Sequence, residues 1–145
     1  GKVWKNHDPV VMAEKLGVRE YVDFVGWVSP EVMPSYIAAS DICFHIPPAH
    51  NEEINRTIQT KIYQYLHMGK PVIVGQAKMA KKFITGNNMG YAIRERDSKD
   101  FADKVIHLYQ NQDLLEEMGK RAREVAAQYV WENTVQDLLD YYNQS

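Results

Sequence analysis

The chain lacks most of the features that mark secreted, membrane or nucleic-acid-binding proteins. It has a single cysteine, Cys43, so it cannot form an internal disulfide. It has no signal-peptide pattern, and no uncharged apolar stretch approaches the roughly 20 residues that span a bilayer. Its net charge of −2 gives no overall reason to expect nucleic acid or an anionic membrane as partner. Cys43, within an apolar run, is predicted to be a core residue in a reducing compartment.

Several catalytic motifs are also missing from the sequence. There is no P-loop, no GxGxxG segment and no nucleophile elbow. His45, His50, Glu52 and Glu53 lie close together in the chain, but their spacing matches no recognised set of metal ligands. We therefore expect no metal and no cofactor, and we assign no catalytic residue.

What the sequence does contain is an alternation of short apolar runs and helical patterns. Residues 41–46 and 71–75 are apolar almost throughout, which is typical of strands covered on both faces in a parallel sheet. Residues 21–26 and 91–93 predict two shorter strands. Helices are expected at 9–16, 29–39, 57–68 and 77–85, followed by three more up to residue 145. This order predicts an α/β fold with a parallel sheet of about four strands.

Charge is unevenly distributed along the chain. Residues 56–96 carry a net charge of +7, whereas residues 98–145 carry −4. Two interpretations remain open for the basic stretch: lysines on solvated helix faces, or a cleft that attracts an anion.

The best candidate for a ligand site is the segment that joins the strand at 41–46 to the next helix. Ligands of open parallel sheets bind beyond the carboxyl ends of the strands, and a helix N-terminus there suits a diphosphate. On that helix, Lys61 and Gln64 share a polar arc, opposite an apolar arc. Lys61 could contact a phosphate and Gln64 a pair of ribose hydroxyls; alternatively, the arc simply faces water. The candidate residues are Asn51, Glu52, Glu53, Arg56, Thr57, Lys61 and Gln64.

Three segments carry a family resemblance. Residues 22–28, 36–47 and above all 61–73 (KIYQYLHMGKPVI) resemble, in order, the carboxyl-terminal domain of the family-four glycosyltransferases of GT-B fold. Residues 88–91 and 118–123, with Tyr129 and Trp131, also fit that domain. The resemblance implies a partial doubly wound, Rossmann-like sheet, the second half of a GT-B fold. We place this domain at residues 1–127 and a C-terminal helix at 128–145.

The same resemblance implies a function. It points to a retaining, metal-independent hexosyltransferase that moves a sugar from a nucleotide diphosphate sugar to a polysaccharide or glycolipid acceptor, with the donor held on this domain. In the family, two glutamates eight positions apart contact the sugar and the ribose of the donor. Arg56 and Gln64 stand at those positions here. Gln64 can still bond a ribose, whereas Arg56 cannot accept a hydrogen bond from a sugar hydroxyl, so Glu52 or Glu53 is expected to bind the sugar instead.

The resemblance also implies missing parts. The acceptor domain, and two strands and a helix that bring an arginine and a lysine to the diphosphate, are expected to precede Gly1. The chain alone is therefore predicted to be inactive, since transfer needs donor and acceptor held in reacting geometry. We expect a cytoplasmic protein, which could touch the inner face of the membrane through its missing domain. The alternatives are a non-enzymatic nucleotide-binding or interaction module and a GT-B sugar-nucleotide epimerase.

Overall fold

The computed structural model describes residues 8–47, 52–95 and 97–130. The chain divides into two units, Gly1–Met33 and Pro34–Ser145, and each is described by itself. The final helix expected after residue 127 falls mostly within 131–145, outside the described residues. The expected domain boundary at 127/128 therefore stays a prediction.

The first helix of the described residues is α1, Pro9–Lys15. Asp8 caps it, because its Oδ1 atom accepts a hydrogen bond of 2.9 Å from the backbone N–H of Val10. Pro9 occupies the first turn, where a missing N–H has no cost. Gly17, with φ of +67°, follows the helix. The helix predicted at residues 9–16 is thus confirmed.

The strand predicted at residues 21–26 is wrong. Tyr21 ends a short 3-10 helix, η1 (Arg19–Tyr21), and residues 22–28 form no strand. Among the described residues, every strand lies in the second unit. Aromatic and β-branched residues favour a strand only where a neighbouring strand supplies hydrogen bonds and a surface to pack on. Without such a partner, Trp27 is left 78% exposed.

Helix α2, Met33–Ala39, begins three residues after Pro30, the first helical position predicted with Ser29 as its N-cap. The carbonyl of Ser29 instead closes a turn, accepting hydrogen bonds from the N–H groups of Val32 and Met33. Pro34 explains the difference, because it has no N–H to bond the carbonyl of residue 30. Starting the helix at Met33 places Pro34 in the first turn, where a proline is tolerated.

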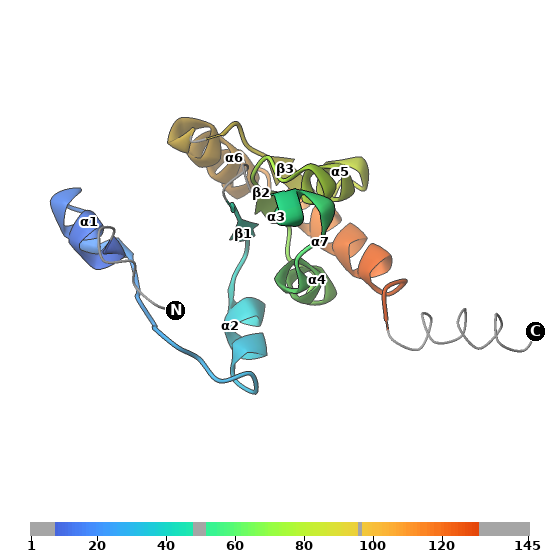
Figure 1. The fold of residues 1–145 in the computed structure, drawn as a ribbon, viewed down its shortest axis with the longest axis horizontal. Helices are drawn as coiled ribbons and strands as arrows, with labels where there is room; N and C mark the ends of the chain where they lie inside the picture. Colours follow the sequence, from blue (N-terminus) through green and yellow to red (C-terminus); the bar gives the residue numbers. More distant parts are fainter. Residues whose placement is uncertain (1–7, 48–51, 96, 131–145) are drawn as a thin grey trace, which may run out of the picture. The chain divides into compact units, whose positions relative to one another are not determined.

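The second unit contains the sheet (Figure 1). Strands β1 (Cys43–His45), β2 (Val72–Val74) and β3 (Gly90–Ala92) are parallel and lie in the order β1-β2-β3. Phe44, Ile73 and Tyr91 are in register across the sheet. The parallel α/β architecture is confirmed, with three described strands in place of about four.

Helices lie on both faces of this sheet, but Phe44 of β1 stays 60% exposed, so β1 is not covered on both faces as the sequence predicted. Helices α4 (Thr60–His67), α5 (Lys78–Gly86) and α7 (Gln112–Ala126) share one buried core with Val72 and Val74. Since alternate residues of a strand face opposite ways, Phe44 and Tyr91 lie on the other face. There they meet helix α6 (Ser98–Gln110), with Phe44 against Phe101 at 5.4 Å between ring centroids. This is the doubly wound arrangement that the sequence predicted.

The segment before α4 differs from the prediction. Residues expected to form a loop make a short helix, α3 (Glu52–Arg56), and α4 begins at Thr60 rather than at Thr57. Two acids in the first turn of α3 and Arg56 in the last match the helix dipole. Glu52 also pairs with Arg56 one turn later, at 3.3 Å. These charges favour a helix. The sequence analysis predicted a loop here because the segment is polar and has no apolar periodicity.

Two glycines allow close packing in this unit. A Cβ atom at Gly90, where φ is +148°, would overlap the carbonyl of Val72 on the neighbouring strand. A Cβ atom at Gly119 of α7 would lie 2.5 Å from the carbonyl oxygen of Gly69, directly after α4. The second contact holds α7 close against the end of α4.

Candidate functional site

The carboxyl ends of the three strands define one edge of the sheet. β1 ends at His45, β2 at Val74 and β3 at Ala92, and the parallel pairing brings these ends together. Helix α5 begins directly after β2 at this edge. Helix α4 precedes β2 and runs back along it, so its N-terminus lies at the same edge. The residues of this carboxyl edge are therefore the strongest candidates for a ligand site.

The first group of predicted site residues lies on and after α3. The guanidinium of Arg56 is 3.3 Å from the carboxylate of Glu52, and both side chains are exposed. Thr57 donates its hydroxyl hydrogen to the backbone carbonyl of Glu53, at 3.1 Å. The Gln59 amide in turn donates to the Thr57 hydroxyl, at 3.0 Å. Asn51 lies outside the described residues.

The second group, Lys61 and Gln64, lies on one exposed face of α4. Residues three apart on a helix are neighbours, so the ammonium and the amide can contact one ligand. The opposite face is apolar, and Ile62 and Leu66 are fully buried in the core. The two arcs predicted for this helix are confirmed. The binding roles proposed for its polar arc stay predictions.

His45 is a polar residue at the end of β1 for which the sequence predicts no role. Its Nε2 atom is buried and has no hydrogen-bond partner in the part of the chain that the structure describes. Burial lowers the pKa of His45, and the positive charge of Lys61 lowers it further. A buried polar atom without a partner is unusual in a folded protein.

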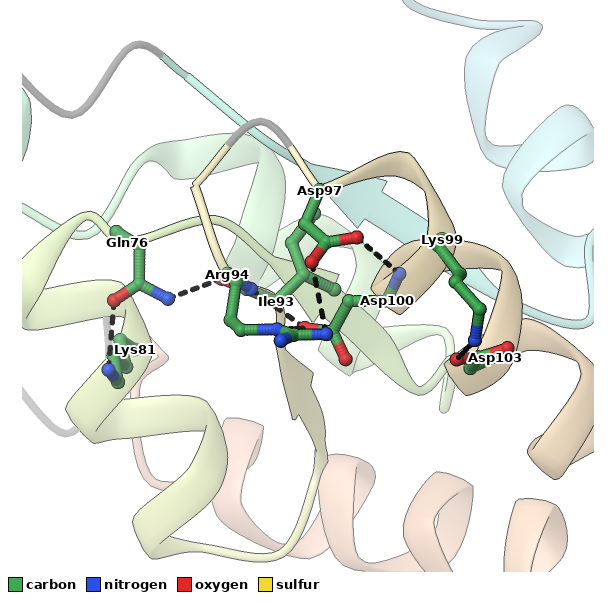
Figure 2. A network of polar contacts seen from close by, with 8 residues as sticks. All are labelled: Gln76, Lys81, Ile93, Arg94, Asp97, Lys99, Asp100 and Asp103. Atoms are coloured by element: carbon green, nitrogen blue, oxygen red, sulfur yellow. Dashed lines mark hydrogen bonds and ion pairs between the residues drawn. The ribbon is translucent and has the colours of Figure 1, made fainter.

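Gln76 connects the ends of two strands with α5 (Figure 2). It follows β2, and its Nε2 atom donates to the carbonyl of Ile93, just beyond β3. Its Oε1 atom accepts a hydrogen bond of 2.9 Å from the ammonium of Lys81. The amide thus holds Lys81 at the carboxyl edge without neutralising its charge.

Two of the acids that follow β3, Asp97 and Asp100, are already paired (Figure 2). Arg94 lies 3.0 Å from the carboxylate of Asp97 and 3.7 Å from that of Asp100. Asp97 caps α6 by accepting from the N–H of Asp100. The N–H of Arg94, 2.8 Å from Asp100 Oδ2, lowers the pKa of Asp100 and keeps it ionised. These carboxylates balance Arg94 and cap α6, rather than compensating the lysines of α5.

A hollow of about 620 Å³ opens beside the start of α5. We call it the basic hollow, because three of its six lining residues are lysines. Its lining residues are Asn55, Gln76, Lys78, Lys81, Lys82 and Thr85. Asn55 of α3 closes one side, since its Oδ1 atom accepts from the backbone N–H of Lys78 at 3.1 Å.

None of the predicted site residues that the structure describes lines this hollow. Of α3, it is Asn55 that lines it, while Glu52, Glu53 and Arg56 do not. The lysines of the hollow were not predicted as site residues. Two signals pointed to them: the net charge of +7 over residues 56–96, and their place in the first turns after a buried parallel strand.

Metal clusters and membrane-spanning helices are absent from the described residues. Over 8–47, 52–95 and 97–130, no three histidine, cysteine, aspartate or glutamate side chains are grouped so that they could hold a metal ion. No helix in these same ranges is both long and apolar enough to cross a membrane.

Comparison with known proteins identifies the class of protein to which this chain belongs. Residues 4–111 match the family model described as glycosyl transferases group 1. This match covers more than half of the chain, which therefore belongs to that family of glycosyltransferases. The D-inositol 3-phosphate glycosyltransferase of Nocardia farcinica is 25% identical over 134 residues, which are 92% of this chain and 28% of that protein.

Solved structures show the same fold. The sucrose-phosphate synthase of Thermosynechococcus elongatus superposes with a TM-score of 0.75 at 18% identity, over 92% of this chain and 32% of that one. WaaG, a glycosyltransferase involved in lipopolysaccharide biosynthesis, superposes with a TM-score of 0.65 at 25% identity, over 81% of this chain and 30% of that one. The chain thus has the fold of one part of a GT-B glycosyltransferase. It spans about a third of the length of the curated relatives it matches.

Proposed function

We propose that this chain is the donor-binding domain of a retaining hexosyltransferase that uses a nucleotide diphosphate sugar. The observation that carries the proposal is the exposed polar face of α4, with Lys61 and Gln64, at the carboxyl edge of a parallel sheet in a member of this family. That edge is where open α/β sheets bind nucleotides. No metal and no cofactor takes part in the proposed reaction.

Each polar group of the edge has a proposed role. Gln64 bonds the ribose hydroxyls, because an amide can donate to one hydroxyl and accept from the other. Lys61 contacts a phosphate oxygen. Glu52 contacts the sugar of the donor. Arg56 stands at the position where the family has its sugar-binding glutamate, but an arginine cannot accept a hydrogen bond. The carboxylate of Glu52 lies beside Arg56 and can accept one.

The proposed reaction moves the sugar between two oxygen atoms. The bond from the sugar C1 atom to the diphosphate oxygen breaks, and a bond from C1 to the acceptor oxygen forms with the same anomeric configuration. The acceptor proton leaves with the diphosphate, whose growing negative charge needs positive groups nearby. Cations at the carboxyl edge suit that need.

We further propose that the whole protein includes an acceptor-binding domain. The relatives are about three times as long as this chain, which leaves room for a second domain in a protein of their size. A relative acts on D-inositol 3-phosphate and WaaG is involved in lipopolysaccharide biosynthesis, by their names. For this protein we propose a polysaccharide or glycolipid acceptor and a cytoplasmic site of action, at the inner face of the membrane.

Calorimetric titration with UDP, GDP and their sugars tests donor binding. Gln64→Ala should weaken the binding of the preferred donor about three- to tenfold, because a hydrogen bond contributes roughly 0.5 to 1.5 kcal/mol. Lys61→Ala should weaken it by a similar factor. Gln110→Ala and Lys120→Ala, exposed helical positions outside the edge, serve as matched controls. Equal affinities for all five proteins would refute the assignment to α4.

The chain alone should not catalyse transfer. Half of a cleft cannot hold donor and acceptor in reacting geometry. Incubation with the bound donor and candidate acceptors should therefore release nucleoside diphosphate no faster than a reaction without protein. Release above that background would contradict the prediction that the chain alone is inactive, and would show that it does more than bind the donor.

A further inference from the structure

Helix α5 takes its N-terminal cap from another helix. Ala77 stands at its N-cap position, where an alanine side chain has no atom that accepts a hydrogen bond. The backbone N–H of Lys78 donates instead to Oδ1 of Asn55, at 3.1 Å, although the two residues are 23 apart in the chain. This hydrogen bond therefore joins α3 to the start of α5 at the carboxyl edge.

The same hydrogen bond helps to fix α3. A helix of five residues is too short to be stable by itself, so α3 depends on its contacts with the rest of the unit. Ile54 packs its side chain against the buried core. An apolar contact has no preferred direction, whereas a hydrogen bond does, so the bond of Asn55 sets how α3 is turned.

Glu52 lies one turn before Asn55 on α3. Residues three apart in a helix are neighbours, so a rotation of α3 that moves Asn55 moves Glu52 with it. Glu52 pairs with Arg56 at 3.3 Å, but both side chains are exposed, and such a pair holds a carboxylate only weakly. A hydrogen bond between a hydroxyl and a carboxylate oxygen spans only about 2.5 to 3.0 Å. Contact between Glu52 and a sugar therefore requires α3 to be held in place.

We propose that Asn55 is a positioning residue for the sugar of the donor. By bonding the first N–H of α5, it holds α3 at the angle that presents the carboxylate of Glu52 to a sugar hydroxyl. This inference rests on the proposed donor-binding function, in which Glu52 contacts the sugar, and it adds a residue that acts without touching the donor. The hydrogen bond of Asn55 then affects the binding of the sugar and not that of the nucleotide, which the polar face of α4 binds.

Calorimetry of the chain separates the contribution of the sugar from that of the nucleotide. The probes are UDP-glucose, UDP-N-acetylglucosamine and GDP-mannose, each compared with UDP or GDP alone. We call the affinity for the nucleotide sugar, divided by the affinity for its nucleoside diphosphate, the sugar ratio. A loss of folded protein lowers both affinities together, so it leaves the sugar ratio unchanged.

Two variants remove the hydrogen bond, one from each side. Asn55→Ala removes the acceptor, and Lys78→Pro removes the donor at the first position of α5, which tolerates a proline. Lys78→Gln is the control for the second variant, because it loses the charge and keeps the N–H. Asn87→Ala is the control for the first, since Asn87 lies at the other end of α5, where its amide donates to the carbonyl of Phe83 at 2.9 Å. Asn55→Asp keeps an acceptor at the same place.

We expect Asn55→Ala and Lys78→Pro to lower the sugar ratio about threefold or more, the effect of losing a hydrogen bond to the sugar. Lys78→Gln, Asn87→Ala and Asn55→Asp should keep the ratio of the unchanged chain. Glu52→Ala should itself lower the ratio. Adding Asn55→Ala to Glu52→Ala should lower it no further, because a positioning residue acts only through the group that it positions.

Other results would overturn the inference. If Glu52→Ala lowers the sugar ratio and neither Asn55→Ala nor Lys78→Pro does, the inference is wrong and the sugar contact of Glu52 stands. A further loss when Asn55→Ala is added to Glu52→Ala would mean that Asn55 contacts the sugar itself, which contradicts a positioning role. If Glu52→Ala leaves the ratio unchanged, the proposed sugar contact fails and this inference fails with it. If no probe binds at all, the donor-binding proposal and this inference fail together.

Discussion

At the scale of single residues, the first and the last residue of β1 have side chains whose ionisation depends on burial. Cys43 is 7% exposed, and its burial raises the pKa of the thiol to about 11, against a smaller opposing effect of Lys70. His45 has its pKa lowered, since burial disfavours the imidazolium and Lys61 repels it. Both residues report whether β1 is packed as described.

Cys43 should resist alkylation in the folded chain. Only the thiolate reacts, and at pH 8 a thiol with a pKa near 11 is far less ionised than one near the ordinary 8.5. Iodoacetamide should modify the folded chain at least about a hundredfold more slowly than the chain unfolded in guanidinium, as followed by mass spectrometry. Similar rates in the two states would show that β1 is open to solvent.

The stability of the chain should fall as the pH drops through the ordinary histidine pKa of about 6.5. The lowered pKa of His45 means that the unfolded chain binds the proton more readily than the folded one, so acid favours unfolding. Urea unfolding at pH 7.5 and 5.5 measures the effect. His45→Gln should reduce the difference between the two pH values, whereas His107→Gln, an exposed histidine on α6, should preserve more of it. An unchanged difference in His45→Gln would contradict the burial of this ring.

The two residues differ in how far the sequence predicts them. Cys43 was expected in the core, because it stands between Ile42 and Phe44 in an apolar run. The unpartnered nitrogen of His45 could not be anticipated, because it depends on what packs over the end of β1 rather than on neighbours in the chain.

At the scale of elements, the contact between α7 and the end of α4 depends on Gly119. Gly119→Ala should lower the free energy of unfolding by about 1 to 3 kcal/mol, the usual range for overpacking a tight contact. Gly86→Ala is the matched control, since Gly86 ends α5 and a Cβ atom there meets nothing within 4 Å. That variant should be as stable as the unchanged chain or slightly more stable. Alanine in a helix gives a free energy of unfolding higher than glycine does by roughly 0.5 to 1 kcal/mol. Urea unfolding of both variants checks the difference, and equal stabilities would mean that α7 does not approach α4 this closely.

Helices and buried strands were predictable where the local pattern and the tertiary packing agree. Helices α1, α4, α5, α6 and α7 and strands β1, β2 and β3 all occur where their apolar spacing indicated, with ends shifted by a few residues. The misses have physical causes. Residues 22–28 pair with no strand in the part of the chain that the structure describes. Pro34 delays α2, and the charges of Glu52 and Arg56 turn an expected loop into α3.

At the scale of the whole molecule, the sequence predicts where the carboxyl edge of the sheet lies better than which residues gather there. The rule for parallel sheets and the polar arc of α4 indicated the edge that Lys61 and Gln64 occupy. The basic hollow could not be found from spacing, because it forms only when Asn55 of α3 meets the start of α5. Its lysines were visible only as part of an excess of positive charge.

The central claim is that a nucleotide sugar binds at the carboxyl edge of the sheet. The most direct test is amide chemical-shift mapping of the nitrogen-labelled chain during titration with UDP- and GDP-sugars. Binding at this edge predicts saturable shifts at residues 60–64 and 76–82. Little change is expected at the opposite, amino-terminal edge, where a hollow is lined by residues 69–71, 115, 116, 119, 120 and 123. Shifts confined to that opposite edge, or no saturable shift with any donor, would contradict it.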